Sequence, residues 1–134
     1  DSMLAKRKNI ICKYDEVVKE IGCKVLEHYT SEYQSSGHLY IVRLFRKDGT
    51  AFSGEERNEF ITKMAELGVG TNVHYKPLPL HTAYKNLGFN IEDYKNAYEQ
   101  YINEVTLPLH ICLTNEDVEY VVWAVKKVYG DMDV

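Results

Sequence analysis

The sequence predicts an α/β (α+β) domain in which one small mixed sheet is covered by about three main helices. Two observations predict this class. Three long segments carry apolar residues at the spacing of three and four that marks amphipathic helices, and runs of β-branched and aromatic residues separate them. A chain of 134 residues also has the length expected for one hydrophobic core, so residues 1–134 are predicted to form a single domain.

The first half of the chain predicts one long helix followed by two strands. The helix covers residues 2–21 and ends at Gly22. Its periodic stripe comprises Leu4, Arg7, Ile10, Ile11, Tyr14, Val17, Val18 and Ile21. A short strand is expected over residues 24–29, and the nearly continuous apolar run at 38–45 is the best candidate for a central strand.

Two capping boxes predict where later helices begin, one at Ser53/Glu56 and the other at Thr114/Asp117. The residues expected on the buried faces of these two helices are Phe60, Ile61, Met64, Leu67, Val118, Val121, Val122, Val125 and Val128. The first of the two helices lies between strand candidates at 38–45 and 69–75. These strands are therefore expected to run parallel if they share a sheet.

The segment between these two helices carries weaker signals. Residues 82–87 are expected to form a short helical turn, and Asn90 is expected to cap a helix over 91–102. Residues 105–111 are expected to be extended. Pro108 within them implies an edge position or a missing hydrogen bond at its own nitrogen.

The stretch 68–81 (GVGTNVHYKPLPLH) is the strongest candidate for a binding edge. Alternation along a strand places Asn72 and His74 together on one face. The opposite, mostly apolar face is expected to be packed, and its members are Val69, Thr71, Val73 and Tyr75. Pro77 and Pro79 then make the chain leave the sheet as a stiff, extended segment. Polar groups at a strand end before a rigid loop favour a ligand-binding edge, although two ordinary surface residues give the same pattern.

Composition and charge exclude several classes of function. The net charge of −4 argues against a nucleic-acid surface, and no apolar run approaches the ~20 residues of a membrane span. The three cysteines, Cys12, Cys23 and Cys112, lack CxxC spacing and are expected to be reduced core thiols of a cytoplasmic protein. The five histidines are scattered, so no metal site is predicted, and no GxSxG nucleophile or glycine-rich phosphate loop occurs.

Five motifs, in their order and spacing, resemble the C-terminal part of the DegT family. They are the run 37–42, Arg57 at the opening of a helix, the run 68–79, the run 84–88, and the paired runs 107–110 and 113–118. Members of this family are pyridoxal-phosphate-dependent nucleotide-sugar aminotransferases of capsule, O-antigen and antibiotic-sugar pathways. The resemblance implies the small domain of a fold-type-I aminotransferase that works as a homodimer, with residues 1–21 as the helix leading in from a large domain.

The resemblance further implies that the parent enzyme uses pyridoxal phosphate to transfer an amino group from a donor, glutamate, to a nucleotide sugar. In this family the Schiff-base lysine, the aspartate that pairs with the pyridinium nitrogen and most phosphate ligands lie in the large domain. No segment of this chain resembles them. We therefore expect the isolated chain to bind no pyridoxal phosphate and to contribute no catalytic residue.

The resemblance also implies which residues approach the sugar nucleotide. The family's His-Tyr pair falls on His74 and Tyr75, and an imidazole or a phenol can bond a sugar hydroxyl. Asn72 could orient that imidazole or touch the substrate, and His38 could line the cleft. Two alternatives remain open: a pyridoxal-phosphate-dependent sugar dehydratase of the same family, or a free-standing ferredoxin-like binding or regulatory module.

Overall fold

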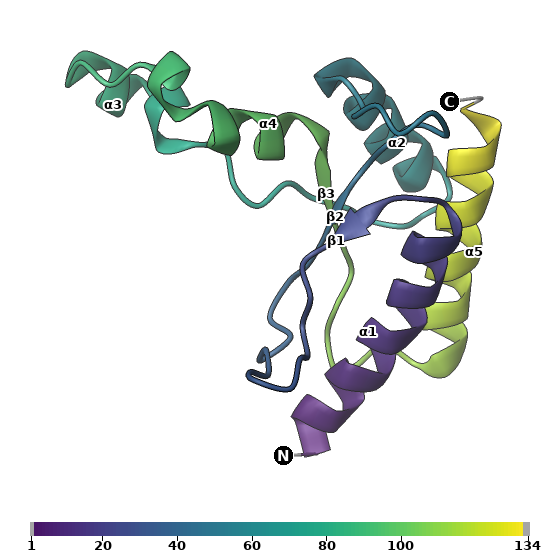
Figure 1. The fold of residues 1–134 in the computed structure, drawn as a ribbon. Coiled ribbons are helices and arrows are strands. Elements are labelled where there is room, and N and C mark those ends of the chain that lie inside the picture. The colour runs from purple at the N-terminus through teal and green to yellow at the C-terminus, as the bar shows by residue number, and fades with distance from the viewer. Residues whose placement is uncertain (1, 133–134) are drawn as a thin grey trace.

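The structure is a computed structural model, and it describes residues 2–132. Helices lie on one side of a small sheet, and a projecting arm lies on the other (Figure 1). The elements in chain order are α1 (Ser2–Glu20), β1 (Lys24–Val25), β2 (Tyr40–Arg43), α2 (Gly54–Glu66), η1 (Leu78–Leu80), α3 (Thr82–Asn86), η2 (Ile91–Tyr94), α4 (Lys95–Asn103), β3 (Glu104–Leu107) and α5 (Asn115–Asp131). The predicted α/β class, with a small sheet and helices packed on it, is confirmed.

The sheet has the order β1-β2-β3, and both strand pairings are antiparallel. A mixed sheet was expected, with the segment after α2 parallel to β2. That segment reaches the sheet only at Asn72, which forms an isolated antiparallel bridge with Thr106 of β3. Because β2 and the Asn72 segment are each antiparallel to β3, they run in the same direction, but β3 lies between them.

One face of the sheet carries the core. Along β2, Tyr40 and Val42 are buried, whereas Ile41 and Arg43 are partly exposed, so the strand has the alternation of a sheet covered on one side. Helices α1, α2 and α5 cover the buried face. Their core residues are Ile10, Ile11, Tyr14, Val17, Val18, Phe60, Met64, Val118, Val121, Ala124, Val125, Val128 and Tyr129. The two capping boxes form as predicted, and each satisfies free N–H groups at the start of its helix.

Three predicted strands are shorter in the structure, and the central one, expected over 38–45, covers only Tyr40–Arg43. The strand expected over 24–29 ends at Val25, because the chain beyond it pairs with itself: Ser35 N–H donates to His28 O (2.7 Å). The strand expected over 69–75 is reduced to the Asn72 bridge. If the pairing of Asn72 with Thr106 continued toward Gly70, the next hydrogen-bonded pair would be Gly70 and Pro108. Pro108 has no N–H to donate, so the ladder stops there.

The cysteine prediction is partly wrong. All three thiols are free and Cys23 is buried, but Cys12 and Cys112 are exposed. Cys12 lies on the face of α1 that no other element covers. Cys12 falls outside the periodic apolar stripe of this helix, and a cysteine fits either a buried or an exposed environment.

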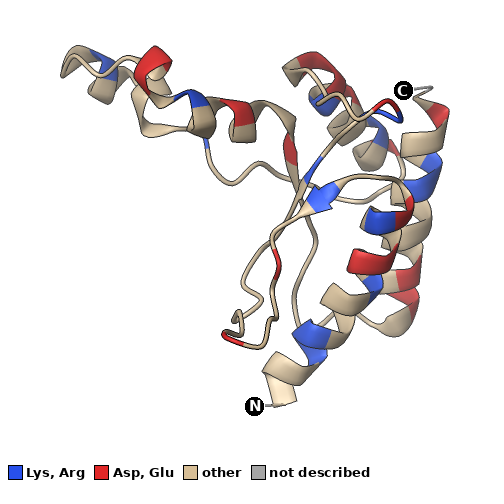
Figure 2. Ribbon diagram, viewed as in Figure 1, with Lys and Arg blue, Asp and Glu red and all other residues tan. Residues whose placement is uncertain are grey.

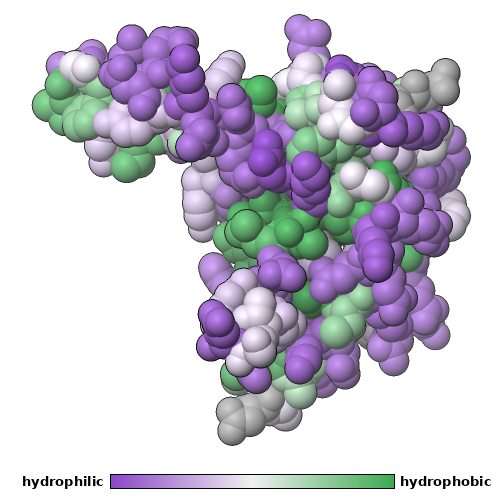
Figure 3. Space-filling model, in the orientation of Figure 1, coloured by the Kyte–Doolittle hydropathy of each residue, from purple (hydrophilic) through white to green (hydrophobic). Residues whose placement is uncertain are grey.

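Residues 77–102, here called the arm, comprise η1, α3, η2 and most of α4, and they project away from the sheet (Figure 1). Pro79 is its only buried residue. Its exposed large apolar side chains are Leu78, Leu87, Phe89, Tyr94 and Tyr98. Apolar side chains gather near the tip of the arm and again in the middle of this face of the molecule (Figure 3).

Charged residues of both signs alternate along α1 and α5 in Figure 2. In residues 2–132 no helix combines the length and the hydropathy that crossing a bilayer requires. Within the same residues no three His, Cys, Asp or Glu side chains are grouped as metal ligands are.

Candidate functional site

An open pocket of about 370 Å³ lies where the segment after α2 meets β3. Its lining comprises His38, Leu39, Gly70, Thr71, Asn72, His74, Thr106, Leu107, Pro108 and Leu109. Three of the four residues predicted to face a substrate, His38, Asn72 and His74, therefore share one pocket. Strand pairing brings them together. Strand β2, which follows His38, and the segment that carries Asn72 and His74 both pair with β3.

Asn72 is held at the pocket by its main chain. Its N–H donates to Thr106 O (3.2 Å) and its carbonyl accepts from Thr106 N–H (2.7 Å). The side-chain oxygen of Asn72 accepts from the N–H of Val73 (2.8 Å), which fixes the orientation of the amide. The exposed side-chain NH₂ group of Asn72 is left as a donor for a ligand.

His74 is half-buried and hydrogen-bonded through one ring nitrogen. Its Nδ1 lies 2.9 Å from Oγ1 of Thr106, which is itself 6% exposed. No hydrogen bond within residues 2–132 involves Nε2, and Nε2 is not among the buried polar atoms that lack a partner. This nitrogen is therefore open to a ligand. The imidazole lines the pocket, and its role toward a substrate stays a prediction.

Tyr75 does not lie on a packed face, contrary to the alternation expected along a strand. Its side chain is 69% exposed and is not part of the pocket lining. The ring meets the ring of His74 edge to face, with centroids 4.8 Å apart, and the peptide bond between the two residues is cis. Tyr75 therefore extends the rim beside His74, and its role toward a substrate stays a prediction.

Two threonines complete the pocket, and sequence analysis assigned neither of them to it. Thr106 pairs with both Asn72 and His74, and Thr71 carries a buried hydroxyl that has no hydrogen-bond partner within residues 2–132. The one sequence signal near Thr106 is Pro108, which ends the strand two residues later. No local pattern could reveal the pairing, because Asn72 and Thr106 are far apart in the chain.

The pocket lining combines polar and apolar residues and contains no Lys, Arg, Asp or Glu. Amide, hydroxyl and imidazole groups can bond the hydroxyls of a sugar. Pyridoxal phosphate held as an imine requires a lysine amine, and its ring nitrogen requires a carboxylate. The residues of this pocket therefore do not fit that cofactor by themselves.

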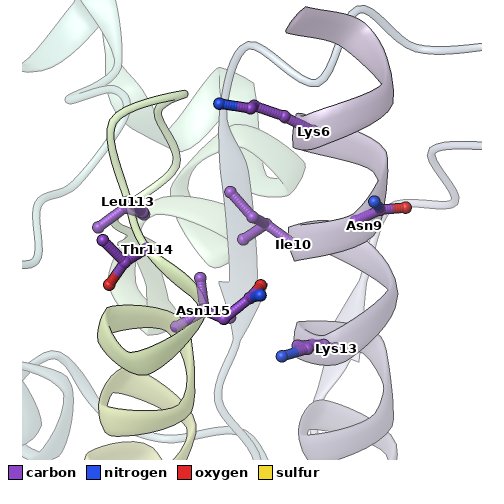
Figure 4. Close-up of a pocket in the computed structure, with 8 residues that line it drawn as sticks. Lys6, Asn9, Ile10, Lys13, Leu113, Thr114 and Asn115 are labelled. Carbon is purple, nitrogen blue, oxygen red and sulfur yellow. The ribbon is translucent and has the colours of Figure 1, made fainter. Parts of the chain in front are cut away.

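A second pocket of about 250 Å³ lies between α1 and the start of α5, with Lys6, Ile10 and Lys13 facing Leu113 and Thr114 (Figure 4). The helix start is already occupied, because the Asp117 carboxylate accepts from the N–H of Thr114 (2.8 Å) and the cap satisfies Asp117 N–H in return. Lys13 pairs with Glu119 (3.3 Å). No buried unpaired polar group of the described chain lies here, so nothing marks it as a ligand site.

Comparison with known proteins gives one family. A sequence profile of the DegT/DnrJ/EryC1/StrS aminotransferase family matches residues 1–126. Two curated relatives are 28% identical to the chain. One is the spore coat polysaccharide biosynthesis protein SpsC of Bacillus subtilis, over 99% of this chain and 34% of its own length. The other is the UDP-4-amino-4,6-dideoxy-N-acetyl-beta-L-altrosamine transaminase of Helicobacter pylori. That match covers 98% of this chain and 34% of the transaminase.

Solved structures lead to the same family. Spr1654 of Streptococcus pneumoniae, assigned as a sugar aminotransferase and solved in PLP and PMP forms, is 45% identical with a TM-score of 0.89, over 98% of this chain and 32% of its own. Helicobacter pylori PseC, an aminotransferase involved in pseudoaminic acid biosynthesis, is 26% identical with a TM-score of 0.81. The match covers 96% of this chain and 33% of PseC. The chain thus spans about a third of the length of each of these relatives.

Proposed function

Because this chain belongs to the DegT/DnrJ/EryC1/StrS aminotransferase family, we propose that it is the C-terminal small domain of a pyridoxal-phosphate-dependent sugar-nucleotide aminotransferase. The parent enzyme would serve polysaccharide or deoxyaminosugar synthesis. The observation that carries the proposal is the grouping of His38, Asn72 and His74 around one pocket whose lining has no Lys, Arg, Asp or Glu. In this proposal the pocket forms one wall of the substrate cleft, and residues 1–21 link to the preceding domain.

Two features support a division of labour between this domain and the rest of the parent. The chain spans only a third of its relatives' length, and its pocket has no lysine or carboxylate for the cofactor. The parent's remaining part would therefore hold pyridoxal phosphate, which supplies the electron sink for amino transfer. The residues described here bind and orient the sugar, and the isolated domain has no transaminase activity of its own.

The exposed arm also fits a domain of a larger protein. Leu87 is 74% exposed and Phe89 44% exposed, and contiguous apolar surface of this kind commonly marks an interaction site. We propose that other parts of the parent homodimer cover the arm. The proposed substrates are a UDP-linked keto sugar, by analogy with the Helicobacter pylori transaminase, and glutamate as the amino donor.

The proposal is tested on the longer polypeptide that contains this chain, loaded with pyridoxal phosphate and given a UDP-4-keto-6-deoxy sugar and glutamate. Formation of the UDP-amino sugar and 2-oxoglutarate is expected. His74→Ala should raise KM or lower kcat for the sugar by about tenfold, the effect of one lost ligand hydrogen bond. His110→Ala is the matched control, because His110 is exposed and lies outside both the pocket and the arm.

Two results would overturn the proposal. Equal kinetics for the native and His74→Ala enzymes would remove the pocket from the substrate cleft. A cofactor absorbance band that survives dialysis of the isolated 134-residue chain would place pyridoxal phosphate on this domain. Loss of a sugar hydroxyl without formation of an amine would instead identify the parent as a dehydratase.

A further inference from the structure

We infer that Thr106 fixes the imidazole of His74 as a hydrogen-bond donor toward the pocket, so that this position selects an oxygen acceptor on the ligand. Thr106 is then a positioning residue, since it acts through His74. The inference deepens the proposed function and rests on it for the identity of the ligand as a sugar nucleotide. Which ring nitrogen of His74 carries the proton follows from the geometry alone.

Thr106 is well suited to hold other groups in place. It belongs to β3, is 6% exposed, and exchanges two main-chain hydrogen bonds with Asn72 (3.2 and 2.7 Å). Its hydroxyl lies 2.9 Å from Nδ1 of His74. One buried residue on a strand therefore orients both the amide-bearing and the imidazole-bearing residues of the pocket. Sites supported by such regular structure are held more accurately than sites on loops alone.

Hydrogen-bond accounting decides the direction of the contact between Thr106 and His74. A hydroxyl carries one donor, and Nδ1 is the only acceptor that it reaches within residues 2–132. If Nδ1–H donated instead, the buried hydroxyl proton would have no partner, which costs free energy. The hydroxyl therefore donates to Nδ1, and the neutral ring carries its proton on Nε2.

The Nε2–H group has no partner within residues 2–132 and is not a buried atom, so it is free to bind a ligand in the pocket that His74 lines. At this point the Nε2–H group donates to a carbonyl, hydroxyl or phosphoryl oxygen of the ligand. It disfavours a ligand N–H group there. The exposed NH₂ of Asn72 is a second donor on the same wall. The two donors together match a ligand edge that is rich in oxygen acceptors.

The first test is NMR of the imidazole nitrogens in the ¹⁵N-histidine-labelled chain at mildly alkaline pH. His74→Gln identifies the signals of the ring by their loss. In the native chain we expect Nε2 to carry the proton and Nδ1 to be unprotonated, and Thr106→Ser should preserve this pattern. Thr106→Val should move both nitrogen signals toward those of free histidine.

A protonated Nδ1 in the native chain, or unchanged ring signals in Thr106→Val, overturns the inference. Neither measurement uses a substrate, so neither result bears on the proposed function.

The second test measures sugar-nucleotide KM in the longer enzyme. Thr106→Val should raise KM about tenfold while Thr106→Ser stays within about twofold, because only serine keeps the hydroxyl. Equal losses in the two variants overturn the positioning role, since they would reflect a general packing defect. If the ring tautomer changes in Thr106→Val and KM does not, the donor is unused by the substrate. That result overturns the donor role and counts against the proposed cleft.

Discussion

The guanidinium of Arg57 donates from Nη1 to the main-chain carbonyl of Tyr101 (3.0 Å) and lies over the ring of the same residue, 5.2 Å from its centroid. The same Nη1 is 3.4 Å from the carbonyl of Glu104, and Arg57 is only 5% exposed. One side chain of α2 therefore ties together the end of α4 and the start of β3. It fixes the base of the arm to the body of the domain.

Arg57→Met should lower the free energy of unfolding by about 2–4 kcal/mol, because the main-chain carbonyls of Tyr101 and Glu104 lose a donor and the cation–π contact is lost. Urea denaturation measures the change, and hydrogen exchange of the α4 amides should quicken. Lys63→Met on the same helix is the control. Among residues 2–132, Lys63 forms an ion pair only with Glu59, at the surface (3.5 Å), a contact worth less than about 0.5 kcal/mol. Equal stability of the two variants would contradict the anchoring role of Arg57.

Thiol reactivity should divide the three cysteines into two classes. Cys23 is 8% exposed, and burial raises the pKa of its thiol to about 11, although a hydrogen bond with the main chain of Phe45 acts in the opposite direction. Cys12 and Cys112 are exposed. Because the thiolate is the reactive form, an aromatic disulfide reagent should modify two thiols of the native chain and the third only after unfolding. Cys23→Ala should keep the two fast reactions; loss of one of them would contradict the assignment.

Helix positions could be predicted because their signals are local. The capping boxes at Ser53 and Thr114 depend on residues three positions apart, and both form in the structure. Periodicity identifies residues that share a face, but it cannot say whether another element covers that face. Tyr75, for example, was expected on the packed face of a strand and is exposed in the structure.

The candidate site was predictable only in part. Asn72 and His74 were recognisable from the alternation along a strand that ends before two prolines, and His38 only from the family resemblance; the structure groups the three in one pocket. The residue that orients two of them, Thr106, was not recognisable. Its role depends on a single bridge to Asn72, and pairing between distant segments leaves no mark in the sequence near either one.

Limited proteolysis should cut the arm first. Pro79 is the only buried residue between positions 77 and 102, so local opening there costs little free energy. Trypsin should cleave after Lys85 and Lys95 before it cleaves after Lys126, which is also exposed but lies on the packed helix α5. Mass spectrometry of the early fragments identifies the cuts. In the longer parent the same sites should be protected; equal cleavage there would contradict the proposal that other parts of the parent cover the arm.

The buried imidazole of His28 should make the stability of the chain depend on pH. His28 is 9% exposed, stacks on the ring of Tyr40 (centroids 5.6 Å apart, planes at 8°), and has Nδ1 3.1 Å from Oγ of Ser35. Burial lowers the pKa of His28, and the nearby carboxylate of Asp15, which accepts from the hydroxyl of Tyr40 (2.7 Å), opposes this only in part. The charged form of the ring is therefore disfavoured in the folded chain.

Because the folded pKa of His28 is lower than that of the unfolded chain, about 6.5, the unfolded state binds the proton first as the pH falls. The stabilising contribution of the neutral ring is complete above about pH 6.5 and is lost as the pH falls through the folded pKa. His28→Gln should reduce overall stability, through loss of the stacked ring, but should also flatten the decrease in urea midpoint between neutral and mildly acidic pH. His81→Gln, which changes an exposed ring, should leave that slope as it is in the native chain. If His28→Gln keeps the native decrease in urea midpoint, another group titrates in this pH range. The buried ring of His28 would then not control the loss of stability in acid.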